Sequence, residues 1–297
     1  MKWLFDKTVL GLFRTVPVRA AHHALFLAQS HPELPERWGY HIRPIHYYEP
    51  LPDFRAITLE QIQRRRNYAA IDFQWDDQLR LLRELEPYAA EVTEVDVTND
   101  YFSGVDAIVY YSLIRHLKPR RIIEIGGGYS TRFAAKALVR NADGATLTCI
   151  EPNPERLNGH ALNIELIQKR VEEIDVDFFS QLEANDIIFI DSSHTVKFGS
   201  DVCYEFLDVL PVLRPGVWVH VHDIFFPHDY PAEWILKRRL ALNEQYLLEA
   251  FLSFNREFQV ALANHWLTLD HAPAVNELWT GDTVSSSFWF YRRETND

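Results

Sequence analysis

Short apolar runs alternate with helically spaced segments through most of the chain after residue 100. A run rich in β-branched residues is typical of a buried strand, and apolar residues at every third or fourth position are typical of a helix. The runs that predict strands are 121–125, 145–150, 164–167, 186–190, 217–221, 258–262 and 288–291. The segments that predict helices are 106–117, 130–138, 202–213 and 240–252. This order predicts an α/β fold with a doubly wound, Rossmann-like sheet of seven strands.

Residues 1–100 follow a different pattern. An irregular stretch at 30–52 contains five prolines and several aromatic residues, and helical spacing returns only at 58–67 and 76–86, before Pro87. A long irregular segment of this kind is usually a lid or an arm on the protein surface. We therefore predict an N-terminal, mainly helical cap or lid segment at 1–100 and a ligand-binding sheet domain at 101–297.

Three glycines follow the first predicted strand directly. Gly126, Gly127 and Gly128 allow the backbone to pass close to a ligand, and the helix that starts after them offers unpaired N–H groups. The second predicted strand ends at Glu151, whose carboxylate can accept both hydroxyls of a ribose at the carboxyl edge of the sheet. An ordinary tight turn is the alternative for the glycines alone. Together the two features predict a nucleoside-cofactor site.

The glycine pattern distinguishes between two cofactors. The dinucleotide fingerprint requires a third glycine at position 131, where this chain has Thr131. The pattern Glu124-x-Gly126-x-Gly128, followed by Tyr129-Ser130, resembles motif I of the class I S-adenosylmethionine (SAM) methyltransferases, and Glu151 resembles their motif II acid. The resemblance implies that SAM is the cofactor and that the last strand of the sheet is antiparallel. It also implies a set of cofactor-binding residues: Glu124, Gly126, Gly127, Gly128, Tyr129, Ser130, Glu151, Glu172 and Asp191.

Polar residues also follow the fourth and fifth predicted strands, at the edge where open α/β sheets bind ligands. Asp191-x-x-His194 follows the fourth strand and His222-Asp223 the fifth, a layout similar to that of the catechol and macrolide-sugar O-methyltransferases. The resemblance implies that His194 is the catalytic base, that Asp191 acts with it, and that a divalent cation, Mg²⁺ or Mn²⁺, is bound. By the same resemblance the metal ligands are Asp191, His222 and Asp223.

The histidine at position 222 leaves undecided which metal is bound and whether one is bound at all. Mg²⁺ prefers oxygen ligands, whereas an imidazole favours Mn²⁺, Fe²⁺ or Zn²⁺. Either the site takes a softer metal, or His222 only orients Asp223, or no metal is bound. His220 lies two residues earlier and is expected to have a structural role.

Composition limits the class of partner. The formal net charge of −12 disfavours a nucleic-acid partner, which normally requires a basic surface. Two cysteines give no disulfide framework, which favours a cytoplasmic protein. No run reaches the roughly 18 apolar residues of a membrane span. The amphipathic segment 2–13 lacks the features of a signal peptide and either packs on the protein or lies on a membrane surface. A homo-oligomer is compatible with the sequence.

These observations favour a SAM-dependent methyltransferase that methylates a hydroxyl on a small molecule or sugar. An NAD(P)-linked Rossmann oxidoreductase is an alternative, but Thr131 and the lack of a Tyr-x-x-x-Lys pair disfavour it. A non-catalytic cofactor-binding protein is a second alternative. Trp234, Trp266 and Trp279 are candidates to stack on a sugar or other ring, although core packing is the expected role of each.

Overall fold

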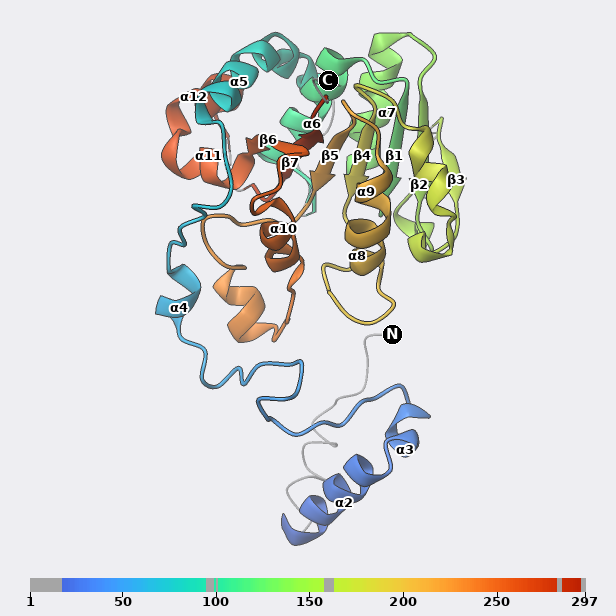
Figure 1. Ribbon diagram of the computed structural model, residues 1–297, viewed down its shortest axis with the longest axis vertical. Coiled ribbons are helices and arrows are strands. Elements are labelled where there is room, and N and C mark those ends of the chain that lie inside the picture. Colours follow the sequence, from blue (N-terminus) through green and yellow to red (C-terminus); the bar gives the residue numbers. More distant parts are fainter. Residues whose placement is uncertain (1–17, 95–98, 100, 158–162, 282–284, 295–297) are drawn as a thin grey trace. The chain divides into compact units, whose positions relative to one another are not determined.

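The chain divides into two units, which are described separately. The computed structural model describes residues 18–94, 99, 101–157, 163–281 and 285–294 (Figure 1). The first unit ends at Ile57 and the second begins at Thr58. The helices of the first unit, in its described part, are α2 (Val18–Ser30) and α3 (Glu33–Glu36). The predicted segment 2–13 lies outside the described residues. No helix in the described part of the chain is both long and apolar enough to cross a membrane.

Seven strands form one sheet in the second unit, as predicted (Figure 1). Their order across the sheet is β3-β2-β1-β4-β5-β7-β6, and β7 runs antiparallel to both β5 and β6. Ile125 is level with Ile150 on one side and with Ile190 on the other, so the carboxyl ends of the central strands lie at the same edge. The strands are β1 (Arg121–Ile125), β2 (Thr146–Ile150), β3 (Glu165–Ile167), β4 (Ile187–Ile190), β5 (Trp218–Val221), β6 (Phe258–Ala263) and β7 (Phe288–Arg292).

Helices cover both faces of the sheet because alternate strand residues point to opposite sides. Ile122, Phe189 and Trp289 belong to one buried cluster, which also includes residues of α5 (Trp75–Ala89), α6 (Gly104–Leu117), α7 (Tyr129–Asn141), α11 (Asn264–Asp270) and α12 (Ala272–Leu278). Ile123 and Ile190 belong to the other, with residues of α8 (Asp201–Tyr204), η5 (Glu205–Val209), α9 (Leu210–Val212) and α10 (Glu244–Leu252). Two packed apolar layers therefore hold the carboxyl edge of the sheet in place.

Several helices differ from the predicted ranges. α4 (Leu59–Gln63) is shorter than predicted, and α5 continues through Pro87 to Ala89 while it packs against α6 and α12. The helix predicted at 202–213 contains a π-helical turn, η5. The helix predicted to begin at 240 begins at Glu244. The connection between β6 and β7 forms α11 and α12.

The segment after α4 belongs with the sheet rather than with the first unit. The Arg66 N–H donates to the Pro227 carbonyl at 2.9 Å, and the Arg66 side chain pairs with Glu249 on α10 at 2.6 Å. The Phe254 N–H donates to the Ala70 carbonyl at 2.9 Å. The sequence predicts residues 58–94 as part of a cap, but they fall in the second unit. Whether any part of 1–100 acts as a lid stays a prediction.

Candidate active site

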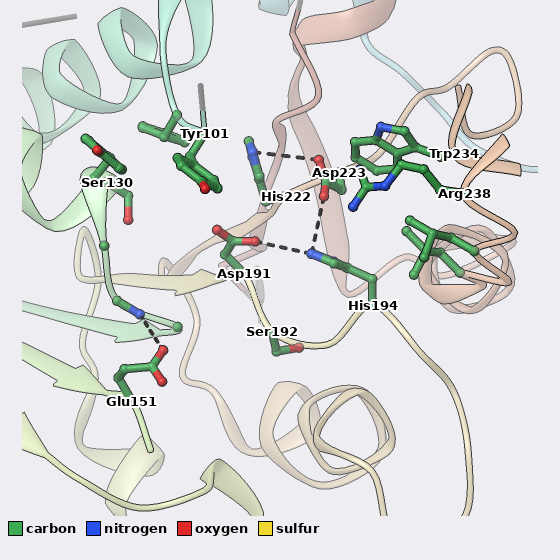
Figure 2. Close-up of a pocket in the computed structure, with 17 residues that line it drawn as sticks. Tyr101, Ser130, Glu151, Asp191, Ser192, His194, His222, Asp223, Trp234 and Arg238 are labelled. Carbon is green, nitrogen blue, oxygen red and sulfur yellow. Dashed lines mark hydrogen bonds and ion pairs between the residues drawn. The ribbon is translucent and has the colours of Figure 1, made fainter. Parts of the chain in front are cut away.

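A cavity of about 500 Å³ opens at the carboxyl edge of the sheet (Figure 2). The ends of β1, β2, β4 and β5 contribute to its wall, and a segment after β5 completes it. The lining residues are Tyr101, Phe102, Gly126, Gly127, Gly128, Tyr129, Ser130, Glu151, Asp191, Ser192, His194, His222, Asp223, Trp234, Arg238, Leu240 and Leu242. The edge that the sequence predicts as the site is therefore hollow.

Two of the three glycines in the turn have no room for a side chain. Gly126 has a left-handed backbone, with φ of +86°, and a Cβ there would lie 2.0 Å from the carbonyl oxygen of Asp191. A Cβ on Gly127 would lie 2.2 Å from the Cys149 sulfur. The Gly128 N–H donates to the Thr131 hydroxyl at 3.0 Å. Thr131, which stands at the position of the third fingerprint glycine, therefore supports the turn.

Glu151 lies against this turn. One of its carboxylate oxygens accepts the Gly127 N–H at 3.2 Å, and the other accepts the Asn153 N–H at 2.7 Å. Each oxygen has a second lone pair, so the carboxylate can still accept two hydroxyls of a ligand. Glu151 also lines a second cavity of about 340 Å³, together with Glu172 and Asp191. Glu172 is 3.5 Å from the Arg170 guanidinium in the same wall.

Glu124 lies beneath the turn and is not among the cavity-lining residues. It is completely buried, and the Tyr110 hydroxyl donates to its Oε1 at 2.9 Å. Burial raises the pKa of Glu124 to about 7. Glu124 is therefore placed to support the turn, and the contact with a cofactor that the resemblance implies stays a prediction.

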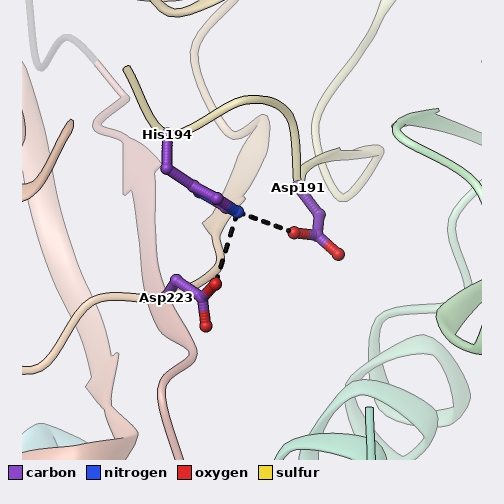
Figure 3. A group of neighbouring side chains, drawn as sticks. All are labelled: Asp191, His194 and Asp223. Carbon is purple, nitrogen blue, oxygen red and sulfur yellow. Dashed lines mark ion pairs between the residues drawn. The ribbon is translucent and has the colours of Figure 1, made fainter. Parts of the chain in front are cut away.

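Asp191, His194 and Asp223 converge on one point (Figure 3). His194 Nε2 is 3.3 Å from Asp191 Oδ1 and 3.3 Å from Asp223 Oδ2. One nitrogen or oxygen atom from each residue lies within 4.8 Å of the others. His194 and Asp223 both have a left-handed backbone, with φ of 57° each. Non-glycine residues rarely adopt this conformation, and such strain often occurs at functional sites.

Glu244 holds His194 from the other side and was not anticipated from the sequence. Its Oε2 is 2.7 Å from His194 Nδ1, and its side chain is 1% exposed. The neighbouring residues at the start of α10 hold the two loops of the site. The Asn243 side chain accepts the Val196 N–H at 2.6 Å, and the Gln245 side chain accepts the Phe225 N–H at 3.1 Å. The polar run Asn-Glu-Gln could have indicated a contact with the site, but it also fits the interior of the helix predicted at 240–252.

The carboxylates around His194 decide its charge. Burial alone would lower the pKa of His194, but hydrogen bonds with Asp191 and Glu244 and the charge of Asp223 raise it well above its usual 6.5. Glu205 lies deeper, accepts the Ser192 hydroxyl at 3.0 Å, and has a pKa that burial raises well above its usual range. In the absence of a cation, these carboxylates therefore favour the protonated form of His194.

His222 lies next to this group but outside it. Its Nε2 is 3.8 Å from Asp223 Oδ1, and the Ser286 hydroxyl donates to the same oxygen at 3.1 Å. Asp106 on α6 accepts the Ser286 N–H at 2.8 Å and so fixes that serine. The structure therefore places His194, rather than His222, with the two aspartates as a candidate ligand. His220 has the structural position expected of it, stacked on Phe189 with ring centroids 3.8 Å apart.

Comparison with known proteins identifies the family. Residues 123–224 match a family model described as a methyltransferase domain. An uncharacterized protein of Archaeoglobus fulgidus is 30% identical over 165 residues, which cover 48% of this chain and 75% of the relative. The family match includes the glycine turn, Glu151 and the Asp191 group, and it lies on the predicted sheet. The chain belongs to the class I SAM-dependent methyltransferases.

Solved structures show partial likeness to this methyltransferase. The O-methyltransferase TomG of Streptomyces achromogenes, solved in complex with SAM and involved in tomaymycin synthesis, is 17% identical with a TM-score of 0.43 over 72% of this chain and 89% of that one. The SAH-bound methyltransferase PaMTH1 of Podospora anserina is 13% identical with a TM-score of 0.44 over 79% and 92%.

The family match excludes the dinucleotide alternative as the account of the glycine turn. Among the residues expected to bind SAM, those of the turn, with Tyr129, Ser130, Glu151 and Asp191, line the main cavity of the methyltransferase, and Glu172 lines the adjacent one. Of the tryptophans named as candidates to stack on an acceptor, Trp234 lines the cavity, whereas Trp266 packs against Phe73 with ring centroids 4.7 Å apart.

Proposed function

We propose that the protein transfers the methyl group of SAM to a hydroxyl oxygen of a small molecule or saccharide. The observation that carries this proposal is the position of Asp191, His194 and Asp223, which share one cavity with the glycine turn. Methyl transfer is an in-line displacement, so the protein must chiefly align two reactants and allow a proton to leave. The cavity provides a donor end and a proton-accepting end for this purpose.

The donor end is formed by the glycine turn and Glu151. SAM would supply the electrophilic methyl group there. The backbone of Gly126–Gly128 offers the close approach that a bound nucleoside needs, and Glu151 would accept its ribose hydroxyls. Asp191 lines both cavities, so it would stand between the nucleoside and the acceptor.

The residues around His194 also fit a divalent cation. Asp191, His194 and Asp223 would supply two carboxylates and one imidazole, and this mixed set suits Mn²⁺ or Fe²⁺ better than Mg²⁺. Glu244 on Nδ1 is the partner that histidine ligands of metals usually have, because it leaves Nε2 directed at the ion. A cation held there would lower the pKa of the acceptor hydroxyl.

In this proposal a carboxylate, rather than His194, accepts the proton of the acceptor hydroxyl. The resemblance assigns the base role to His194, but its Nε2 would be taken up by the cation or, without a cation, by the proton that its raised pKa favours. We assign the proton to Asp191 or Asp223 and give His194 a positioning role. A carboxylate suffices because the acceptor oxygen becomes strongly acidic as its new bond to carbon forms, and the proton then passes to the nearest anion.

Calorimetry with SAM, S-adenosylhomocysteine (SAH) and NAD⁺ tests the donor end. We expect SAM and SAH to bind and NAD⁺ not to bind. Asp223→Asn should leave SAH affinity nearly unchanged but abolish or strongly weaken Mn²⁺ binding, while Asp208→Asn on the exposed side of η5 should change neither. Binding of NAD⁺ without SAM would overturn the proposal, and unchanged Mn²⁺ binding in Asp223→Asn would remove the cation from it.

A further inference from the structure

One wall of the cavity comes from a short π-helical turn, η6 (Glu233–Lys237), in the segment that follows β5. Trp234 and Arg238 lie on this turn and at its end, and both line the cavity (Figure 2). The Arg238 guanidinium carbon is 5.7 Å from the centre of the Trp234 ring. Phe225 contacts the same ring edge-on, with centroids 5.5 Å apart, and so fixes its orientation. Neither side chain is used by the proposed methyl transfer.

Arg238 stands out by its charge. Among the residues that line the cavity it is the one arginine or lysine, whereas Glu151, Asp191 and Asp223 are acids. Within the described part of the chain its guanidinium has no carboxylate partner, although the adjacent Lys237 pairs with Glu233 at 4.0 Å. An arginine that lies over an aromatic face keeps its in-plane N–H donors available. The cavity is therefore lined by three acids and a single arginine.

We propose that the methyl acceptor is a hydroxylated ring compound that carries a carboxylate or phosphate group. This inference rests on the proposed function and adds the substrate class. The ring would stack on Trp234, and the anionic group would accept two N–H bonds from Arg238, a geometry that guanidinium groups favour. Asp191 and Asp223 would repel the anionic group, so it would pair with Arg238 while a hydroxyl of the ring faces the two carboxylates.

The charge pattern also predicts which compounds are poor acceptors. A neutral sugar would stack on Trp234 but would leave Arg238 without an anion. A charge-assisted bidentate pair typically strengthens binding by roughly 10- to 100-fold, so the anionic compound should bind more tightly by this factor. Loss of the guanidinium should remove that advantage and leave the binding of the neutral compound unchanged.

The experiment compares three probes that share one ring: D-glucuronate, D-glucose 6-phosphate and D-glucose. Their affinities are measured by calorimetry and by ligand-observed NMR on the full chain, with saturating SAH and Mn²⁺. The proteins are the wild type, Arg238→Gln and the matched control Lys237→Gln, which removes a neighbouring charge that does not line the cavity. SAH binding is measured first in every sample, and its absence would count against the proposed function rather than against this inference.

We expect the wild type and Lys237→Gln to bind at least one anionic probe roughly 10- to 100-fold more tightly than glucose, and Arg238→Gln to lose this preference while it keeps its SAH affinity. The stronger of the two anions identifies a carboxylate or a phosphate as the recognised group. If SAH binds but the wild type shows no preference for either anion, including the case in which no probe binds, the inference is wrong. A preference that persists in Arg238→Gln also overturns it.

Discussion

Glu244→Gln is the substitution that most sharply tests how the site is held. The carboxylate of Glu244 is 2.7 Å from His194 Nδ1 and almost fully buried. Glutamine has nearly the same shape and can still accept that N–H, so the change replaces a charged partner by a neutral one. A hydrogen bond to a charged group contributes about 1.5–3 kcal/mol and a neutral one about 0.5–1.5 kcal/mol, which gives an expected loss of about 1–2 kcal/mol in the free energy of unfolding.

The same substitution should weaken the proposed cation site. Outer partners of histidine ligands typically account for about 10- to 100-fold in metal affinity. Mn²⁺ affinity is measured by electron paramagnetic resonance, and stability by chemical denaturation without metal. Glu249→Gln is the matched control, because it removes a carboxylate from the same helix, where it pairs with Arg66 instead of His194. Glu249→Gln should leave Mn²⁺ affinity unchanged.

The stability and Mn²⁺ measurements together distinguish the structural role of Glu244 from its role in metal binding. Unchanged stability and unchanged Mn²⁺ affinity in Glu244→Gln would refute the role of Glu244 in holding His194. Reduced stability with unchanged affinity would keep Glu244 as a structural partner but would remove His194 as a ligand. Equal loss of affinity in Glu244→Gln and Glu249→Gln would show that the effect arises from α10 as a whole.

Three further predictions concern the donor end. Glu151→Gln should weaken SAH binding by roughly 10- to 100-fold in calorimetry, because a single amide oxygen replaces two charged acceptors, and unchanged affinity would contradict the ribose contact. Gly126→Ala should destabilise the protein by clearly more than Gly144→Ala, since both positions have positive φ but only an alanine at 126 would clash with a backbone atom. Equal losses of stability in thermal denaturation would show that the backbone moves away from Asp191 to make room for the methyl group. Glu124 has a pKa of about 7 in the folded protein against an ordinary 4.5, so the folded state binds its proton more tightly than the unfolded state. The contribution of Glu124 to the free energy of unfolding therefore falls by about 3 kcal/mol as pH rises from about 4.5 to 7. Glu124→Gln should lose that part of the pH dependence, and an unchanged difference between pH 4.5 and 7 in denaturant titrations would show that Glu124 is not held as described.

The sheet could be predicted closely because its signals are local. Each strand is an apolar run of a few residues, and the glycine turn and Glu151 follow two of these runs directly in the sequence. The carboxyl ends of parallel strands meet at one edge, so the strand pattern by itself is enough to place Asp191 and Asp223 together. The antiparallel position of β7 followed from the resemblance to a known family.

The partners of His194 could not be predicted in the same way. Glu244 is fifty residues away in sequence and reaches the site only because α10 begins where the loops after β4 and β5 meet. The choice between His194 and His222 as neighbour of the aspartates depends on backbone conformation, since the left-handed φ of His194 turns its ring toward Asp223. The support that Asp106 gives to Ser286 spans 180 residues and left no local pattern.

The central claim is that one cavity holds SAM at the glycine turn and faces it with Asp191, His194 and Asp223. A crystal structure of the protein with SAH and Mn²⁺, with anomalous scattering recorded at the manganese edge, tests it most directly. We predict SAH along Gly126–Gly128 with its ribose at Glu151, and an anomalous peak among the two carboxylates and His194 Nε2. SAH bound elsewhere would contradict the account of the donor end, and a peak held by His222 in place of His194 would contradict the account of the cation site.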